Sequence, residues 1–185
     1  MSDFFDQITE KQAEFIARQP VFFVATSAPG ARINLSPKGM DSFRVLAGGK
    51  SCAYLDYGGS GNETHAHLAA DGRITIMFCA FDQPPLIYRI YGHGRAVLPQ
   101  DPDFAELASL FTIERGVRQI FLITVDSTQE SCGWAVPKMQ LVEERQTLRK
   151  YHAQEEPAER LAKYQDRIRS IDGLPVTPPS KLPYS

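Results

Sequence analysis

The feature that most constrains the fold is a series of short strand-like runs that begins after Pro20 and is interrupted by glycine and proline. Runs rich in β-branched and aromatic residues, bounded by turn formers such as Gly48-Gly49, are typical of a β-meander. Roughly seven strands with two intervening helices, and no regular alternation of strand and helix, argue against a Rossmann sheet and indicate a small barrel with helical attachments. We expect strands over residues 21–26, 32–35, 43–46, 52–56, 74–81, 86–98 and 119–125.

Three segments carry helix signals. Asp3 is a candidate N-cap for a first helix, which we expect to cover an open face of the sheet. Asn62 can cap a short helix, and Asp101-Pro102 starts another. Within the long strand at 86–98, Gly92 and Gly94 offer places for a bulge or a barrel corner, and a bent strand helps to close a barrel.

The chain divides into a barrel domain with its N-terminal helix, residues 1–137, and a C-terminal helical arm with an extended tail, residues 138–185. The second part has mixed charge, and Leu161, Tyr164 and Ile168 form an apolar stripe at helical spacing. The stripe fits either a solvated helix packed by one edge on the barrel or an arm that stabilises a dimer. The proline-rich end cannot continue a helix and is expected to be extended, either loose or lying on a partner.

The composition indicates no attraction to nucleic acid or membranes, because 23% of the 185 residues are charged and the formal net charge is -2. The chain starts with acidic residues where a secretory signal needs basic ones, and no apolar run approaches the ~18 residues of a membrane span. We therefore expect a cytoplasmic protein. Cys52, Cys79 and Cys132 lack the spacing of a disulfide framework or a zinc site and are expected to be buried thiols.

A first candidate site is Ser36-Pro37-Lys38-Gly39, directly after a predicted strand. Lys38 brings a point charge and Ser36 a hydroxyl, a pair suited to a phosphate ester, while Gly39 lets backbone approach a ligand. The alternative is an ordinary turn with an exposed lysine.

A second candidate is the segment 57–64, in which Gly58-Gly59-Ser60-Gly61 precedes a predicted helix start. Free N–H groups and neighbouring hydroxyls can point at a phosphate there. The glycines lack the spacing of a Walker or dinucleotide-binding loop, and a flexible turn is the alternative. His65 and His67 point about 200° apart on a helix, so we expect them not to share a metal ion.

Two further candidates come later in the chain. Arg89 lies mid-strand among apolar neighbours, where an arginine usually needs an anion, and Tyr91 rather than Tyr88 falls on its face. The alternative is an arginine whose head group reaches solvent. Trp134, the only tryptophan, can stack on a ring or fill an interface, whereas Cys132 has no histidine partner in the sequence that would make it a nucleophile.

Taken in order, these elements resemble the pyridoxamine 5'-phosphate oxidase-like, FMN-binding split β-barrel superfamily over about residues 20–137. The Ser36-Pro37-Lys38-Gly39 segment is similar to the S-P-K-G of its uncharacterised FMN-dependent branches, and residues 61–64 to their G-N-R-T. Residues 89–92 are similar to the R-[IV]-x-G strand and residues 132–137 to C-G-x-x-V-P. The resemblance implies a mainly β (α+β) fold, a split β-barrel of about six to eight antiparallel strands with peripheral helices.

The resemblance also implies a homodimer with FMN in a groove between the subunits, Trp134 being contributed by the other subunit. The implied activity is that of an oxidoreductase of an unknown small-molecule substrate, with hydride transfer at flavin N5 and no identified proton donor. Glu63 stands where the motif has an arginine, and a carboxylate there would repel a phosphate. The implied cofactor-binding residues are Ser36, Pro37, Lys38, Gly39, Tyr57, Gly61, Asn62, Glu63, Thr64, Arg89 and Trp134.

Three alternatives stand beside this hypothesis: a flavin- or heme-binding sensor or storage module without turnover, a deazaflavin-dependent reductase, and an empty barrel used only for dimerisation. The Glu63 replacement and the absence of an obvious acid–base residue favour the first. The R-L-x-P substrate element of true pyridoxamine-phosphate oxidases is missing from the C-terminal part, so oxidation of vitamin B6 is not expected.

Overall fold

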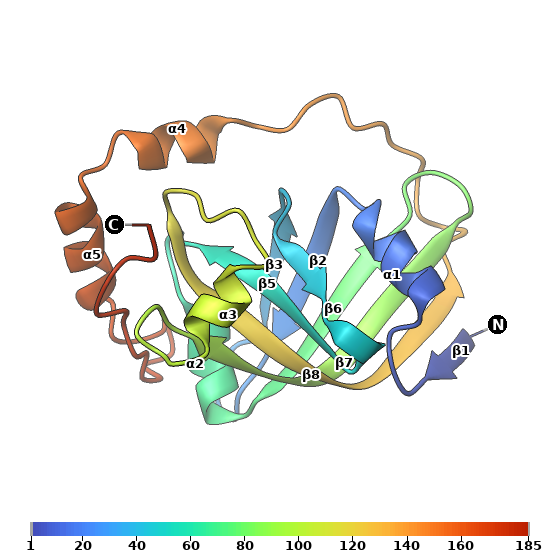
Figure 1. Ribbon diagram of the computed structural model, residues 1–185. Helices are drawn as coiled ribbons and strands as arrows, with labels where there is room; N and C mark the ends of the chain where they lie inside the picture. The colour runs from blue at the N-terminus through green and yellow to red at the C-terminus, as the bar shows by residue number, and fades with distance from the viewer. Residues whose placement is uncertain (1, 185) are drawn as a thin grey trace.

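The computed structural model describes residues 2–184, which form one strongly curled, eight-stranded antiparallel sheet with helices at its periphery (Figure 1). The strand order is β3-β2-β6-β7-β8-β5-β4, with β1 paired to β8. Because β3 and β4 end this order, the sheet curls without closing, which confirms the predicted split barrel. The strands are β1 (Ser2–Phe5), β2 (Val21–Thr26), β3 (Asn34–Gly39), β4 (Phe43–Val45), β5 (Ser51–Tyr57), β6 (Arg73–Cys79), β7 (Leu86–Val97) and β8 (Val117–Cys132).

The first helix starts later than Asp3 suggested. Residues Ser2–Phe5 instead pair with the end of β8, and Thr9 caps the helix in a reciprocal capping box with Gln12. The Asp3 prediction was wrong because Thr9-x-x-Gln12 satisfies the helix start better than an isolated aspartate. The helices are α1 (Glu10–Ala17), α2 (Glu63–Ala70), α3 (Phe104–Ala108), α4 (Thr147–Ala153) and α5 (Pro157–Gln165), with a 3-10 turn η1 (Ala47–Gly49).

The strand β3 also differs from its prediction, because it extends through residues that the sequence places in a turn. Pro37 lies opposite Phe23 in the ladder with β2. A proline cannot donate to a ladder, but β3 is an edge strand and has only one neighbour to satisfy. Ser36 and Lys38 are therefore strand residues, whose side chains have directions set by the pleat.

A bulge is present at Gly92, one of the two glycines predicted to allow one. The register of β7 with β8 shifts between Tyr91 and Gly92, and a Cβ atom on Gly92 would lie 2.1 Å from the carbonyl oxygen of Thr124. Only glycine fits this close approach, which accompanies a local bend of the long strand.

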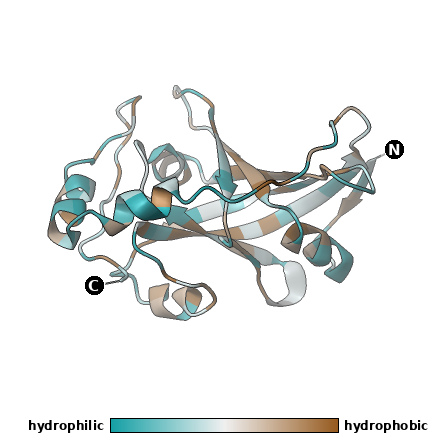
Figure 2. Cartoon of the chain, turned by 90° about the horizontal axis from the view of Figure 1, so that it is seen from above, coloured by the Kyte–Doolittle hydropathy of each residue, from teal (hydrophilic) through white to brown (hydrophobic). Residues whose placement is uncertain are grey.

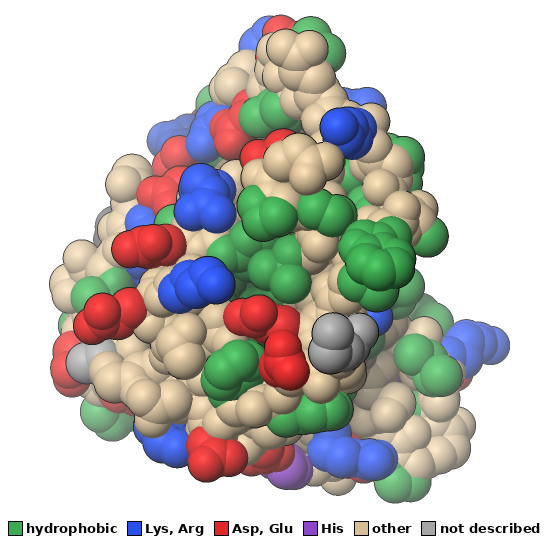
Figure 3. Space-filling model, turned by 90° about the vertical axis from the view of Figure 1, so that its right-hand side faces the viewer, with side chains coloured by type: hydrophobic (Ala, Val, Ile, Leu, Met, Phe, Trp, Pro, Cys, Tyr) green, Lys and Arg blue, Asp and Glu red, His purple; other side chains and the backbone are tan. Residues whose placement is uncertain are grey.

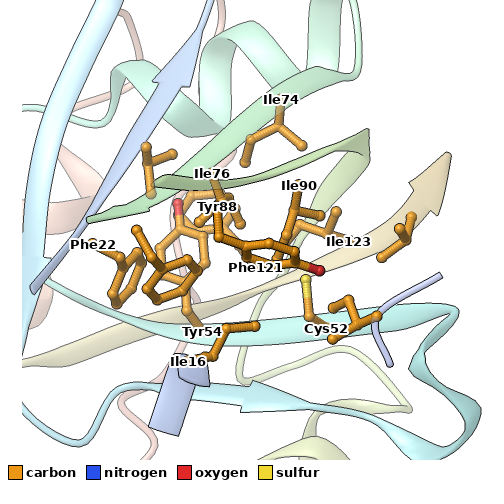
Figure 4. Packing of buried hydrophobic residues seen from close by; sticks show 14 of the residues in the cluster. Ile16, Phe22, Cys52, Tyr54, Ile74, Ile76, Tyr88, Ile90, Phe121 and Ile123 are labelled. Atoms are coloured by element: carbon orange, nitrogen blue, oxygen red, sulfur yellow. The ribbon is translucent and has the colours of Figure 1, made fainter. Parts of the chain in front are cut away.

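The core lies inside the curl and is rich in aromatic rings (Figure 4). The ring of Phe78 lies 5.4 Å from that of Phe22, and Tyr54 lies 5.1 Å from Phe121, distances typical of packed aromatic pairs. Cys52 and Cys79 are buried as predicted. Cys132 is exposed, contrary to prediction, because it ends β8 beyond the core.

The part of the chain after β8, residues 133–184, is called the C-terminal arm below. It crosses the top of the molecule in Figure 1 as a long extended segment, forms α4 and α5, and returns to the barrel as the red tail. The two helices are largely hydrophilic (Figure 2), yet Tyr164, Val176 and Leu182 are buried. Of the predicted stripe, Tyr164 is buried, whereas Ile168 lies beyond the end of α5 and is exposed. Within residues 2–184, no helix combines the length and apolar character needed to cross a membrane.

Candidate functional site

A cavity of about 210 Å³ lies where the barrel fails to close, between β3, the end of β5, residues 58–61, the start of α2 and the start of β8. We call it the seam cavity. Side chains alternate along β3, so Ser36 and Lys38 face the cavity while Leu35 and Pro37 face outward and are exposed. The cavity is lined by Asn34, Ser36, Lys38, Asp56, Tyr57, Gly59, Ser60, Gly61, Asn62, Glu63, Thr64 and Arg118.

The Asp56 carboxylate is the hub of the polar groups at the base of this cavity. Arg118 donates two hydrogen bonds to one carboxylate oxygen, from Nε at 3.0 Å and Nη2 at 2.7 Å, and Gln119 donates a third at 2.9 Å. Lys38 approaches the other oxygen at 3.4 Å. Asp56 and Arg118 are almost fully buried, whereas 24% of the Lys38 side chain is exposed. Lys38 is thus the more accessible of the two cations.

Two opposing effects set the pKa of Asp56. Burial acts to raise the pKa, but the charges of Arg118 and Lys38 and the hydrogen bonds from Arg118 and Gln119 outweigh it, so the pKa lies below its ordinary value. The carboxylate stays ionised at neutral pH. At the base of the cavity one buried anion faces two cations, and the Glu63 carboxylate also lines the cavity.

The loop at residues 58–61 and the start of α2 are fixed by the same network. Arg118 donates from Nη1 to the carbonyl oxygen of Gly61 at 3.0 Å, and Gln119 donates to Asn62 Oδ1 at 2.8 Å. Asn62 is at the N-cap position as predicted, but its side chain makes no capping bond to α2. The first N–H groups of a helix have no intrahelical partner, so those of α2 are open to other acceptors.

The two histidines of α2 have separate partners. His65 Nδ1 lies 2.9 Å from Gln119 Oε1, while its Nε2 accepts a hydrogen bond from the Thr177 N–H at 3.3 Å, which assigns the proton to Nδ1. Burial lowers the pKa of His65, so it is neutral at neutral pH. His67 Nδ1 instead lies 3.1 Å from Thr26 Oγ1.

Two titratable groups of the cavity lining have pKa values shifted by their surroundings, and both shifts lead away from neutral pH. Tyr57 is half-buried, and burial raises its pKa to about 12. Asp56 is ionised, and no histidine or cysteine within residues 2–184 lines the cavity. The arrangement is suited to holding and orienting an anionic ligand rather than to proton transfer by a side chain.

Most of the predicted site residues meet in this one place. Seven of them line the cavity: Ser36, Lys38, Tyr57, Gly61, Asn62, Glu63 and Thr64. Pro37 and Gly39 belong to β3, where Pro37 faces away from the cavity and Gly39 follows Lys38 at the strand end.

Arg89 lies on the opposite side of the sheet from Lys38. Arg89 pairs with Met77, Met77 with Phe23, and Phe23 with Pro37, so these four side chains share the outer face. Its guanidinium donates to Ser131 Oγ at 3.0 Å. Arg89 of this chain therefore does not contribute to its own seam cavity.

Trp134 lies just beyond the end of β8 and is 84% exposed. It borders a separate cavity of about 350 Å³ formed with the β6–β7 turn. The end of β8 is at the right of Figure 1, and the view from that side shows apolar side chains gathered among charged ones (Figure 3). Among the described hydrogen bonds and ring contacts, none joins the Trp134 indole to a residue of the seam cavity.

Sequence reasoning missed three polar residues of the cavity: Asn34, Asp56 and Arg118. Asn34 donates to Thr64 Oγ1 at 3.0 Å and joins β3 to α2. The available signal was polarity inside otherwise apolar strands, since Asp56 ends one such run and Arg118 begins another. What it could not supply was the pairing of β5 with β8 that brings them together.

Comparison with known proteins agrees with this architecture. Residues 8–132 match the family model described as pyridoxamine 5'-phosphate oxidase. A curated relative, the pyridoxamine 5'-phosphate oxidase family protein ustO of Aspergillus flavus, is 38% identical over 153 residues, which cover 80% of this chain. The chain spans 61% of the length of that relative.

Solved structures share the fold at low identity. The HupZ protein of Group A Streptococcus superposes with a TM-score of 0.53 at 21% identity, covering 67% of this chain and 99% of that one. A Clostridium acetobutylicum protein related to general stress protein 26 gives a TM-score of 0.50 at 14% identity, covering 66% and 86%. The family model matches well over half of the 185 residues, including the strands around the seam cavity. This chain therefore belongs to the pyridoxamine 5'-phosphate oxidase family.

Proposed function

We propose that this chain binds FMN at the seam cavity and acts as an FMN-dependent oxidoreductase on a small molecule. The observation that supports this most is the convergence of Ser36, Lys38 and Thr64 on one cavity at the open edge of the family fold. An ammonium, two hydroxyls and the free N–H groups of a helix start make a donor set that suits a phosphate monoester.

The donor set fits the phosphate of the cofactor. The nearest carboxylate oxygen to Lys38 is 3.4 Å away, which is longer than the roughly 2.7–2.9 Å of a strong charge-assisted bond, so the ammonium has capacity for another anion. Thr64 Oγ1 accepts from Asn34, which leaves its own hydroxyl proton for another acceptor. Bound flavin would supply the hydride chemistry, and the protein would supply anchoring and orientation.

We propose further that the working form is a homodimer. A cavity of about 210 Å³ is below the range of roughly 300–1,000 Å³ that encloses a typical cofactor-sized ligand, so a flavin would need a second wall. Ile33, just before β3, and Leu35 within it are 81% and 65% exposed, and apolar residues along such an edge are suited to burial against a second copy. Arg89 and Trp134 would then serve the partner's site rather than their own.

The first test is an absorbance spectrum of purified protein after loading with FMN and desalting. Retention of the flavin bands is expected, with loss of retention in Lys38→Ala and little change in Lys11→Ala, which removes an exposed lysine of α1. Loss of one charged anchor should weaken FMN by roughly tenfold or more. A wild-type protein that retains no flavin would refute the proposed cofactor.

A flavin-binding module without turnover is the second candidate, because the described lining of the cavity contains no histidine or cysteine, Asp56 is held ionised, and burial raises the pKa of Tyr57 to about 12. Mixing the loaded protein with reduced nicotinamide separates the two: bleaching of the flavin bands indicates an oxidoreductase, and stable bands indicate binding alone. A deazaflavin is distinguished by mass spectrometry of the cofactor released from the protein.

Heme is less well supported by this cavity. Heme iron is usually held by histidine, cysteine, methionine or tyrosine. Among the described residues that line the cavity, only Tyr57 is of one of these types. Iron binding requires the phenolate form, and the raised pKa of Tyr57, about 12, opposes it.

A further inference from the structure

The C-terminal arm returns to the seam cavity directly after α5. Arg167 donates from Nη1 to the carbonyl oxygen of Gly59 at 2.5 Å, and Gly59 lines the cavity. In Figure 1 the red tail lies beside α2, whose start forms the opposite edge of the cavity. A cation from the arm therefore stands at the rim of the proposed phosphate site.

A second contact holds this part of the arm in place. Both carboxylate oxygens of Glu63 accept the N–H of Ile171, at 3.1 and 3.3 Å. The next residue, Asp172, forms an ion pair with the guanidinium of Arg32. The backbone N–H of Arg32 also donates to the Asp172 carboxylate, at 2.8 Å. The segment that carries Arg167 is thus tied to the barrel at Glu63 and again at Arg32.

The start of α2 carries a carboxylate, Glu63, and the arm brings a cation, Arg167, beside the loop that leads into this helix. The motif G-N-R-T has an arginine where this chain has Glu63, and this chain has Arg167 beside the same loop. Within residues 2–184, neither side chain forms an ion pair, and Arg167 uses one of its five N–H donors on Gly59. Its remaining donors can face an anion at the rim.

We propose that Arg167 supplies the cation for the anionic end of the ligand and that Glu63 positions it by anchoring the arm. The proposal rests on the proposed function, since the anion in question is the FMN phosphate. It makes the C-terminal arm part of the binding site, and it assigns Glu63 a role other than contact with the ligand.

The decisive measurement compares FMN with riboflavin, which differ by the phosphate alone. Arg167→Gln should weaken FMN by about threefold to tenfold, a range reduced for solvent screening, and leave riboflavin unchanged. The matched control is Arg169→Gln, an exposed arginine of the same arm that donates only to Gly173 within the described chain. Equal weakening of both ligands in Arg167→Gln would show a merely structural role and overturn the proposal.

Variants at Glu63 test the anchor against simple repulsion. Glu63→Ala removes a negative charge and the anchor together, and Glu63→Gln removes the charge but retains an acceptor for the Ile171 N–H. The anchor predicts that Glu63→Ala weakens FMN relative to riboflavin, whereas Glu63→Gln binds FMN as well as or better than the wild type. Tighter FMN binding in Glu63→Ala would refute the anchor.

Inorganic phosphate separates this proposal from the proposed cofactor. At constant ionic strength, phosphate should raise the melting temperature of the wild type and of Arg169→Gln, but raise that of Arg167→Gln less. If that pattern holds while no flavin binds, the anion site stands and the FMN function fails. Two outcomes would show that Arg167 does not bind the anion. In the first, Arg167→Gln responds like the wild type to both phosphate and FMN. In the second, phosphate stabilises none of the proteins and FMN does not bind.

Discussion

The barrel and the C-terminal arm both bury aromatic side chains, but they are held by different forces. In the barrel, Phe78 is 1% exposed and its ring lies 5.1 Å from that of Phe43, within a continuous apolar cluster. In the arm, Tyr164 is 3% exposed, but its ring lies 5.6 Å from the guanidinium of Arg118 and 5.5 Å from that of Arg160. Its hydroxyl donates to the carbonyl oxygen of Gly116 at 3.3 Å.

This difference matters because the seam cavity adjoins both regions. Apolar packing involves no group that titrates and no charge that salt screens, whereas contacts between charged groups respond to pH and to ionic strength. The apolar core of the barrel should therefore be the most rigid part of the molecule, and the contacts that hold the arm at the seam cavity should be the first to open.

The largest effect is expected for Phe78→Ala. Removing a fully buried ring costs about 3–5 kcal/mol through lost burial and the cavity left behind. The free energy of unfolding in urea measures it, with Leu141→Ala as control, because Leu141 is 58% exposed on the extended segment of the arm. A loss below about 1 kcal/mol would mean that the barrel does not depend on this cluster.

Asp56→Asn tests the charged hub beneath the cavity. Two cations lose their common counter-charge, one of them almost fully buried, and we expect a loss of about 3 kcal/mol in the free energy of unfolding. Asp126→Asn is the control, since its carboxylate pairs with His93 at 50% exposure and should matter by less than about 0.5 kcal/mol. Equal losses of unfolding free energy in the two variants would show that the burial of Asp56 with Arg118 does not affect stability.

Tyr164→Ala should release the arm without unfolding the barrel. Loss of the buried ring and of its hydrogen bond to Gly116 is expected to weaken docking by about 2 kcal/mol. Hydrogen exchange should then accelerate in residues 147–182 and stay slow in β6 and β7. Uniform acceleration across the barrel would contradict the separation of the two regions.

The smallest effect concerns pH and His152 of α4. Burial, assisted by the charge of Arg160, lowers the pKa of His152 to about 4, against 6.5 for the unperturbed group. The unfolded arm therefore binds a proton more readily, so the contribution of His152 is complete above about pH 6.5 and is lost as the pH falls towards about 4. We expect a change on the order of 1 kcal/mol, seen as faster proteolysis of the arm at about pH 5 than at about pH 7.

His152→Gln is the control for this pH dependence and should flatten it. A part should remain, because burial also lowers the pKa of His65, which accepts the Thr177 N–H from the tail. An unchanged pH profile in the variant would exclude His152 as the titrating group.

Local patterns predicted much of the barrel and half of the site. The helix start after Gly61 was readable in the residues, and seven predicted site residues line one cavity, although Ser36 and Lys38 were expected in a turn and lie in β3. The start of α1 was misplaced although its capping box was visible in the sequence at Thr9 and Gln12. Cys132 was predicted to be buried, and its exposure depends on where β8 leaves the core.

The sequence by itself determined the class of fold, because glycine and proline mark the turns and the strand period of two is a local property. It also indicated which residues are candidates for binding an anion. Only the tertiary structure decided which of these residues meet. Asp56 and Arg118 are 62 positions apart in the sequence, and the pairing of β5 with β8 brings them together. Arg89 faces outward because of the register between the four strands β3, β2, β6 and β7. The same holds for Arg167 at Gly59, 108 positions apart, because long-range contacts follow from the packing of the whole chain.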